Sequence, residues 1–197
     1  MTASIQYVTP LFGTRLSTHH RVGNYYKMLA NRDRAGIAGL IKLRLEERYV
    51  FPVEHSKQRN GFASMALSCL LIETIQCFRD GKEDTTKKGA GAKAFREYFA
   101  WNQAPNGFSG LGQDFYANVR CGILHQGETK KGWTITRKVG LPLFDSARKQ
   151  VHAEKFLKAV NESLEAYCRE LEQTMWNDPL WGKCRDKMKF IIKHCKQ

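Results

Sequence analysis

Residues 111–133, LGQDFYANVRCGILHQGETKKGW, combine a helical pattern of apolar residues with polar residues that the pattern does not require. Phe115 and Val119 are spaced to form a packed stripe on a helix that we expect over about Gly112 to His125. Arg120 falls on the neighbouring stripe, beside the core rather than opposite it. The stretch therefore predicts a helix that carries a cation at the edge of a hydrophobic core.

The second polar residue, His125, lies in the last predicted turn of this helix. Gly127 and the polar residues around it end the helix, and a helix C-terminus favours a protonated imidazole. Arg120 and His125 are separated by about 140° and about 7.5 Å on an ideal helix, so they do not share one face. Two such helices, antiparallel across a two-fold axis, would bring each Arg120 towards His125 of the partner subunit. This spacing predicts a homodimer.

The segment Arg120-Cys-Gly-Ile-Leu-His125 resembles the R-x4–6-H signature of HEPN domains, named for higher eukaryotes and prokaryotes nucleotide-binding. The longer string VRCGILHQGETKKGW is similar to bacterial members of that superfamily, and the resemblance extends over about residues 60–176. It implies a helical domain that dimerises through the motif-bearing helices. In many members such a domain is a metal-independent endoribonuclease of toxin–antitoxin or phage-defence systems.

The activity that the resemblance implies needs no metal and no cofactor. His125 would act as general base or acid around a ribose 2′-hydroxyl, and Arg120 would stabilise charge on the scissile phosphate. The product would be a 2′,3′-cyclic phosphate, so the substrate would be RNA. Cys121 departs from the pattern, because many active members have a polar residue immediately after the motif arginine.

A carboxylate interrupts the most apolar predicted helix, which runs from about Gly61 to Arg79. Glu73 shares its side with Cys69 and Cys77, and burial of a carboxylate requires a cationic or hydrogen-bonding partner. Arg120 is the partner that we expect. Two alternatives stay open: Glu73 at a helix edge facing water, and an ion pair that is structural without being catalytic.

Other polar residues complete the candidate site. Residues near the motif are expected to orient His125 or contact a base: Tyr116, Asn118, Gln126 and Glu128. Basic residues of the flanking loops and of a predicted hairpin are expected to contact RNA phosphates: Lys87, Lys88, Lys130, Lys131, Arg137 and Lys138.

The charge of the chain supports a polyanionic partner. Lys and Arg number 32 against 19 Asp and Glu, a net charge of +13, and such a surplus attracts nucleic acid. An acidic protein, such as an antitoxin-like partner, or an anionic membrane surface would also satisfy this charge. We expect a cytoplasmic protein without a membrane partner, because the sequence has neither a signal-peptide pattern nor an apolar run of membrane-spanning length.

The 197 residues predict a single, mainly α domain, a bundle of five or six helices with a small β-hairpin after the motif helix. Residues 1–30 are expected to form an irregular arm. A helix capped by Asp33 is expected to stop at Pro52. A basic helix is expected over residues 177–197, with Lys187 among its solvated cations.

The cysteines and the remaining histidines suggest no second site. The six cysteines form no CxxC pair and are expected to be buried, reduced thiols rather than zinc ligands or disulfides. The other histidines are expected at the surface: His19, His20, His55, His152 and His194.

Three hypotheses follow. The first is a HEPN-type endoribonuclease. The second is a non-catalytic nucleotide- or RNA-binding module, which Cys121 favours. The third is a helical scaffold whose basic faces bind an acidic protein.

Overall fold

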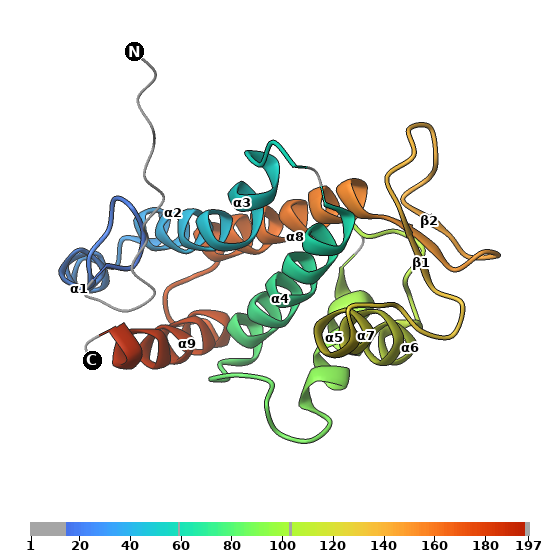
Figure 1. The fold of residues 1–197 in the computed structure, drawn as a ribbon. Coiled ribbons are helices and arrows are strands. Elements are labelled where there is room, and N and C mark those ends of the chain that lie inside the picture. The colour runs from blue at the N-terminus through green and yellow to red at the C-terminus, as the bar shows by residue number, and fades with distance from the viewer. Residues whose placement is uncertain (1–14, 59, 103, 196–197) are drawn as a thin grey trace, which may run out of the picture.

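The computed structural model describes residues 15–58, 60–102 and 104–195 and is mainly helical, as predicted (Figure 1). Its helices of eight residues or more are α1 (Val22–Ala30), α2 (Arg34–Leu45), α4 (Gly61–Asp80), α5 (Ala90–Trp101), α8 (Ala153–Gln173) and α9 (Pro179–Cys195). The two longest, α4 and α8, pack against each other, with α2 along α8 and α5 and α9 along α4. Helix α4 is therefore the central element of the core.

Helix α4 is apolar because it is surrounded by protein. By length and composition alone it is apolar enough to cross a membrane, but most of it is buried inside the molecule. Asn60 caps its start through bonds from the N–H groups of Phe62 and Ala63, and Gly81 ends it in a left-handed conformation. Burial inside the protein therefore accounts for its apolar composition.

An aromatic cluster fixes the motif-bearing helix to its neighbours. The Phe115 ring lies 5.7 Å from Phe95 of α5, 5.3 Å from Phe156 of α8 and 5.4 Å from Trp133, measured between centroids. All four rings are nearly or fully buried. Each such pair adds to the stability gained from buried apolar area, so the motif helix is held rigidly on one side.

The helix after Asp33 does not stop at Pro52, contrary to the prediction. Asp33 caps α2 through the N–H of Gly36, as expected. A π-helical turn, η1 (Glu46–Val50), then leads into one more helical turn, α3 (Phe51–Glu54). Pro52 stands in the first turn of α3, where its missing N–H and fixed φ are tolerated.

The small β element is present, but its pairing is not the predicted hairpin. The strands are β1 (Thr134–Thr136), β2 (Phe144–Asp145) and β3 (Gln150–His152), in the order β1-β3-β2. Strand β3 pairs parallel with β1 and antiparallel with β2, so it separates the two strands expected to pair. Val151 of β3 is fully buried, and this burial draws β3 to the centre of the sheet.

The predicted irregular arm contains a helix. Val22 and Tyr25 are buried on one face of α1, so packing against the body stabilises a segment whose local pattern is weak. Residues 1–14 of the predicted arm lie outside the described residues.

Two other surface predictions are wrong, and the predicted burial of the thiols is confirmed for five of the six. His152 is 4% exposed, and its ring accepts a bond from the Lys155 N–H at the start of α8. Lys187 is 9% exposed and donates to the carbonyl oxygen of Glu83, so it is not a solvated cation. All six cysteines are free, five of them buried and Cys121 half-buried.

Candidate functional site

The motif lies on one continuous helical segment that contains a π turn. Helix α6 (Gly112–Phe115) leads into η2 (Tyr116–Arg120) and then α7 (Cys121–Gln126), and the N–H of Cys121 donates to the carbonyl of Tyr116. A π turn adds one residue to the helical turn and shifts the faces of the residues that follow. Phe115 and Val119 both stay buried, while Arg120 is directed towards α4.

Arg120 and Glu73 form a largely buried ion pair. The Arg120 Nε donates to Glu73 Oε1 at 2.6 Å, and the two side chains are 17% and 10% exposed. Burial lowers the pKa of Arg120, but the hydrogen bond and the charge of Glu73 more than offset this, and the pKa is raised. The guanidinium therefore stays charged, and the contact expected from the buried carboxylate is present.

A third residue holds the carboxylate from the other side. The Thr85 hydroxyl donates to Glu73 Oε2. Thr85 belongs to the loop between α4 and α5, so both oxygens of Glu73 are engaged, one by the motif helix and one by this loop. The site thus connects the central helix, the loop that follows it and the motif helix, which lies about 50 positions after Glu73.

Tyr116 and two thiols surround the guanidinium. The Tyr116 ring centroid lies 5.4 Å from Arg120 Cζ, within range of a cation–π contact. Burial raises the pKa of Tyr116, and the neighbouring Cys121 adds to the rise. Burial also raises the pKa of the fully buried Cys69 thiol, so this group is an inert wall of the site.

His125 lies in the last turn of α7 and is exposed. Among the described residues, no hydrogen bond or ion pair engages its imidazole, and none joins it to Arg120. Gly127 ends the helix with φ +70°, as the sequence predicted. His125 is therefore open to a ligand or to a second subunit.

Gly122, between the two motif residues, allows another segment of the chain to approach the helix closely. A Cβ at this position would lie 2.3 Å from the carbonyl oxygen of Glu128, because the chain folds back over the helix after Gly127. The N–H of Glu128 donates to the carbonyl of Gly122 at 3.3 Å. The close approach places the segment after the motif against α7.

The residues expected to support the site divide into two groups. Asn118 is buried and donates to the Asp114 carbonyl oxygen and carboxylate, and this carboxylate also accepts a bond from the Trp133 indole at 2.8 Å. The Asn118 amide is therefore engaged within the motif helix, and among the described residues no hydrogen bond joins it to His125. Gln126 and Glu128 are exposed at the same helix end as His125.

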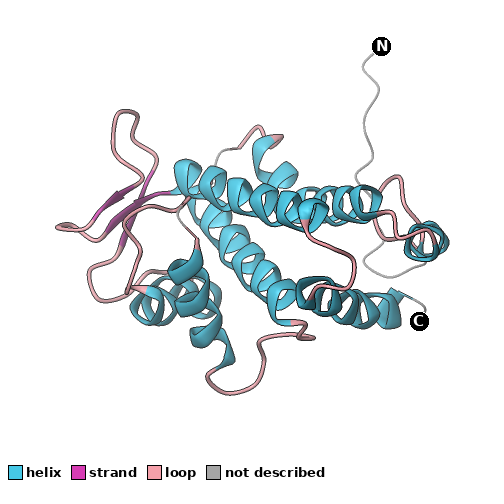
Figure 2. Ribbon diagram, turned by 180° about the vertical axis from the view of Figure 1, so that it is seen from behind, coloured by secondary structure: helices cyan, strands magenta, loops and turns pink. Residues whose placement is uncertain are grey.

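The basic residues expected to contact phosphate do not form one surface. Lys87 and Lys88 lie on the loop between α4 and α5, whereas Arg137 and Lys138 follow β1. Figures 1 and 2 show this loop below the helices and the strands at one side. Arg137 is paired with Glu154 at 3.1 Å, and Lys138 is exposed. Lys130 and Lys131 follow the motif helix, half-buried and exposed respectively.

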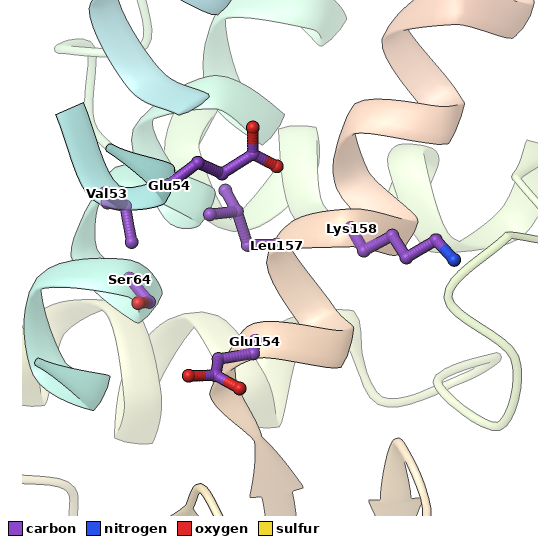
Figure 3. A pocket seen from close by; sticks show the side chains of 6 residues that line it. All are labelled: Val53, Glu54, Ser64, Glu154, Leu157 and Lys158. Carbon is purple, nitrogen blue, oxygen red and sulfur yellow. The ribbon is translucent and has the colours of Figure 1, made fainter. Parts of the chain in front are cut away.

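Two hollows in the surface differ in charge. One, of about 300 Å³, lies between α3, α4 and α8, and Figure 3 shows Glu54 and Glu154 at its opposite ends with Leu157 between them. The other, of about 900 Å³, is formed by the α4–α5 loop, the start of α5 and Phe190 of α9, and basic side chains dominate its lining. The second hollow is the one suited to phosphate.

Three residues near the site were not predicted from the sequence. Thr85 contacts Glu73, and Arg96 lines the larger hollow. Both follow or precede the predicted basic residues Lys87 and Lys88 by fewer than ten positions, so their nearness in the sequence could have indicated them. Phe190 lies on the distant α9, and no local pattern connects it with the loop.

No protein-family model, curated protein or solved structure matches this chain.

Proposed function

We propose that this protein is a HEPN-type, metal-independent endoribonuclease that acts as a homodimer. The observation that carries the proposal is the contrast between the two motif residues. Arg120 is charged and fixed by Glu73 at the edge of the core, whereas His125, five positions later, is exposed at the helix end. A fixed cation beside an accessible acid–base group is suited to phosphodiester chemistry.

The reaction is an internal displacement within the RNA. His125 accepts the proton of the ribose 2′-hydroxyl, and the 2′-oxygen forms a bond to the adjacent phosphorus. The bond from phosphorus to the 5′-oxygen of the next nucleotide breaks, and that oxygen takes a proton from a protonated imidazole. Arg120 offsets the negative charge that develops on the phosphate oxygens. The products are a 2′,3′-cyclic phosphate and a 5′-hydroxyl.

The exposed face of the motif helix supports pairing with a second copy. Gln113, Ala117 and Leu124 are exposed, and Leu124 is one of the few large apolar side chains at the surface. Because all three are exposed, they lie on the part of the motif helix that faces away from the core. An antiparallel partner on this side would place His125 of the partner subunit near Arg120, which His125 of the same chain does not contact.

The test is cleavage of an RNA pool by the full-length chain in EDTA, with and without His125→Ala. We expect cleavage by the unsubstituted protein, products ending in 2′,3′-cyclic phosphate, and loss of cleavage in the variant. His19→Ala, which removes another exposed histidine, is the matched control. Equal cleavage by a folded His125→Ala protein would reject the assignment.

A second candidate function is RNA binding without cleavage. It is favoured by the ion pair itself, since a guanidinium held by Glu73 has part of its hydrogen-bonding capacity occupied. The half-buried Cys121, at a position where many active HEPN members have a polar residue, points the same way. Salt-dependent RNA affinity with no cleavage of any RNA in the pool would select this function.

A further inference from the structure

The larger hollow is an anion site by composition. Five cations line it: Lys82, Lys87, Lys88, Lys93 and Arg96. The Glu83 carboxylate pairs with His194 at 3.1 Å, whereas Asp84 accepts bonds from the N–H and hydroxyl of the neutral Thr86 and keeps its charge. Lys82 and Lys93 pair with carboxylates outside the lining, Asp80 at 2.7 Å and Glu97 at 3.4 Å. Lys87, Lys88 and Arg96 therefore carry the surplus of positive charge. The potential inside the hollow is therefore positive, and a phosphate is a matching ligand.

The loop that forms this hollow is anchored at its start and in its middle. Gly81 begins it with φ +71°, where a Cβ would meet the backbone of Lys183 at 3.0 Å. Lys187 donates to the Glu83 carbonyl oxygen, and the Thr85 hydroxyl donates to Glu73. The walls of the hollow are consequently formed before a ligand arrives, which reduces the ordering cost of binding.

An aromatic side chain completes the lining. Phe190 of α9 lies in the wall of the hollow, yet it does not belong to the apolar residues packed against the core. Within the described ranges it is paired with no other aromatic ring. An aromatic face beside several cations is the combination that binds a nucleobase together with its phosphate.

The hollow adjoins the Arg120 site. Thr85 lies between Asp84 and Thr86, which line the hollow, and its hydroxyl contacts the carboxylate that holds Arg120. On the other side the Tyr116 ring packs on Gly91 at the start of α5, so closely that a Cβ there would lie 2.5 Å from the ring. The hollow and the Arg120 site are therefore joined through residues 84–86 of the loop.

We propose that this hollow binds one nucleotide unit of single-stranded RNA, with the base against Phe190 and the phosphate between Lys87, Lys88 and Lys93. The choice of RNA as the ligand rests on the proposed function. A free nucleoside triphosphate has the same base-and-phosphate chemistry and is the alternative source of this ligand.

The first test is equilibrium binding of a short fluorescent single-stranded RNA to full-length protein carrying His125→Ala, over a range of KCl concentrations. Lys87→Ala/Lys88→Ala should weaken binding and reduce the slope of log K against log[salt] by about 0.7 for each phosphate that is no longer neutralised. Lys27→Ala/Lys158→Ala removes the same charge from exposed sites on α1 and α8 and should leave the slope nearly unchanged. Equal effects of the two double variants would overturn the site.

The second test separates stacking from charge. Phe190→Ala should weaken RNA binding roughly 5- to 100-fold without altering the salt slope, and Phe190→Tyr should retain it. Circular dichroism and thermal unfolding confirm that each variant is folded. Unchanged RNA affinity in a folded Phe190→Ala protein would overturn the stacking role.

Competition identifies the source of the nucleotide. ATP should displace the RNA only at concentrations far above the RNA dissociation constant. Tight ATP binding that depends on Lys87 and Phe190 would overturn RNA as the ligand. The proposed catalysis and the proposed binding site can fail separately. If the protein binds RNA through the hollow but cleaves no RNA, the catalysis is rejected and the binding site is retained.

Discussion

Glu73 and Arg120 are 47 positions apart in the sequence, and the Arg120 Nε lies 2.6 Å from Glu73 Oε1 between the central helix and the motif helix. Each charge is largely removed from water and depends on the other for compensation. The pair therefore joins α4 to the motif helix and fixes the orientation of the guanidinium.

Reversing either charge of this pair should destabilise the protein. Glu73→Arg or Arg120→Glu would leave two like charges at a poorly solvated position, and we expect a loss of about 3 kcal/mol in the free energy of unfolding. The exchange variant Glu73→Arg/Arg120→Glu should recover part of that loss, measured by urea denaturation. If the loss in the exchange variant equals the sum of the losses in the two single variants, the contact between the two side chains contributes no stability of its own.

The half-buried pair Lys42–Glu165, which is more open to water than Glu73–Arg120, is the comparison for that experiment. Its side chains are 37% and 34% exposed, and its atoms approach to 2.8 Å. Because water screens this pair, reversing one charge should cost less than about 1 kcal/mol.

Gly122→Ala should destabilise the fold although alanine favours helices. The added Cβ would lie 2.3 Å from the Glu128 carbonyl oxygen, so the returning chain must shift, at a cost of about 1–3 kcal/mol. Gly39→Ala in α2 is the comparison, since the new methyl group would meet no atom within 4 Å and the helix should gain roughly 0.5–1 kcal/mol. Thermal and urea unfolding of both variants give the answer, and a stable Gly122→Ala protein would contradict the close approach.

Leu124→Glu should convert the proposed dimer to a monomer. The side chain is 36% exposed on the motif helix, and a carboxylate at the centre of a two-fold interface faces its own copy. Val139→Glu introduces the same charge at a side chain that is 93% exposed after β1, and it should leave the mass unchanged. Sedimentation equilibrium measures both. A dimer that survives Leu124→Glu would place the interface elsewhere.

Stability should fall above pH 9 through the buried thiols. Burial raises the pKa of Cys168 and of Cys184 to about 12 from an ordinary value near 9. Their stabilisation is complete below pH 9, because the unfolded thiols then keep their protons, and it is lost as the pH rises towards 12. Each thiol should contribute a loss of about 1.4 kcal/mol per pH unit over that window.

The variant Cys168→Ala isolates one of these thiols. The cavity left by the missing sulfur atom lowers stability at every pH. The decline of the unfolding free energy between pH 9 and 11 should nevertheless be shallower in the variant than in the parent protein. The comparison of slopes also removes the opposing effect of Lys187, whose pKa is lowered by burial and which gains stability as the pH rises. Parallel slopes in the two proteins would exclude the thiol as a source of the pH dependence.

The sequence by itself determined the elements whose signals are local. Asp33 caps a helix where predicted, because a cap depends on a side chain and an N–H only two or three positions away. The apolar character of the sequence identified α4 and the motif helix. The requirement that a buried carboxylate be compensated was enough to predict the contact between Glu73 and Arg120.

Tertiary structure alone decided the features built from distant segments. Strand β3 enters the sheet because Val151 is buried there, α1 forms because Val22 and Tyr25 meet the body, and Lys187 is buried beneath a loop about 100 positions away. The basic hollow brings Phe190 to the α4–α5 loop in the same way. Periodicity reports which face of a segment is buried, whereas the partner of that face is fixed only when all the helices pack together.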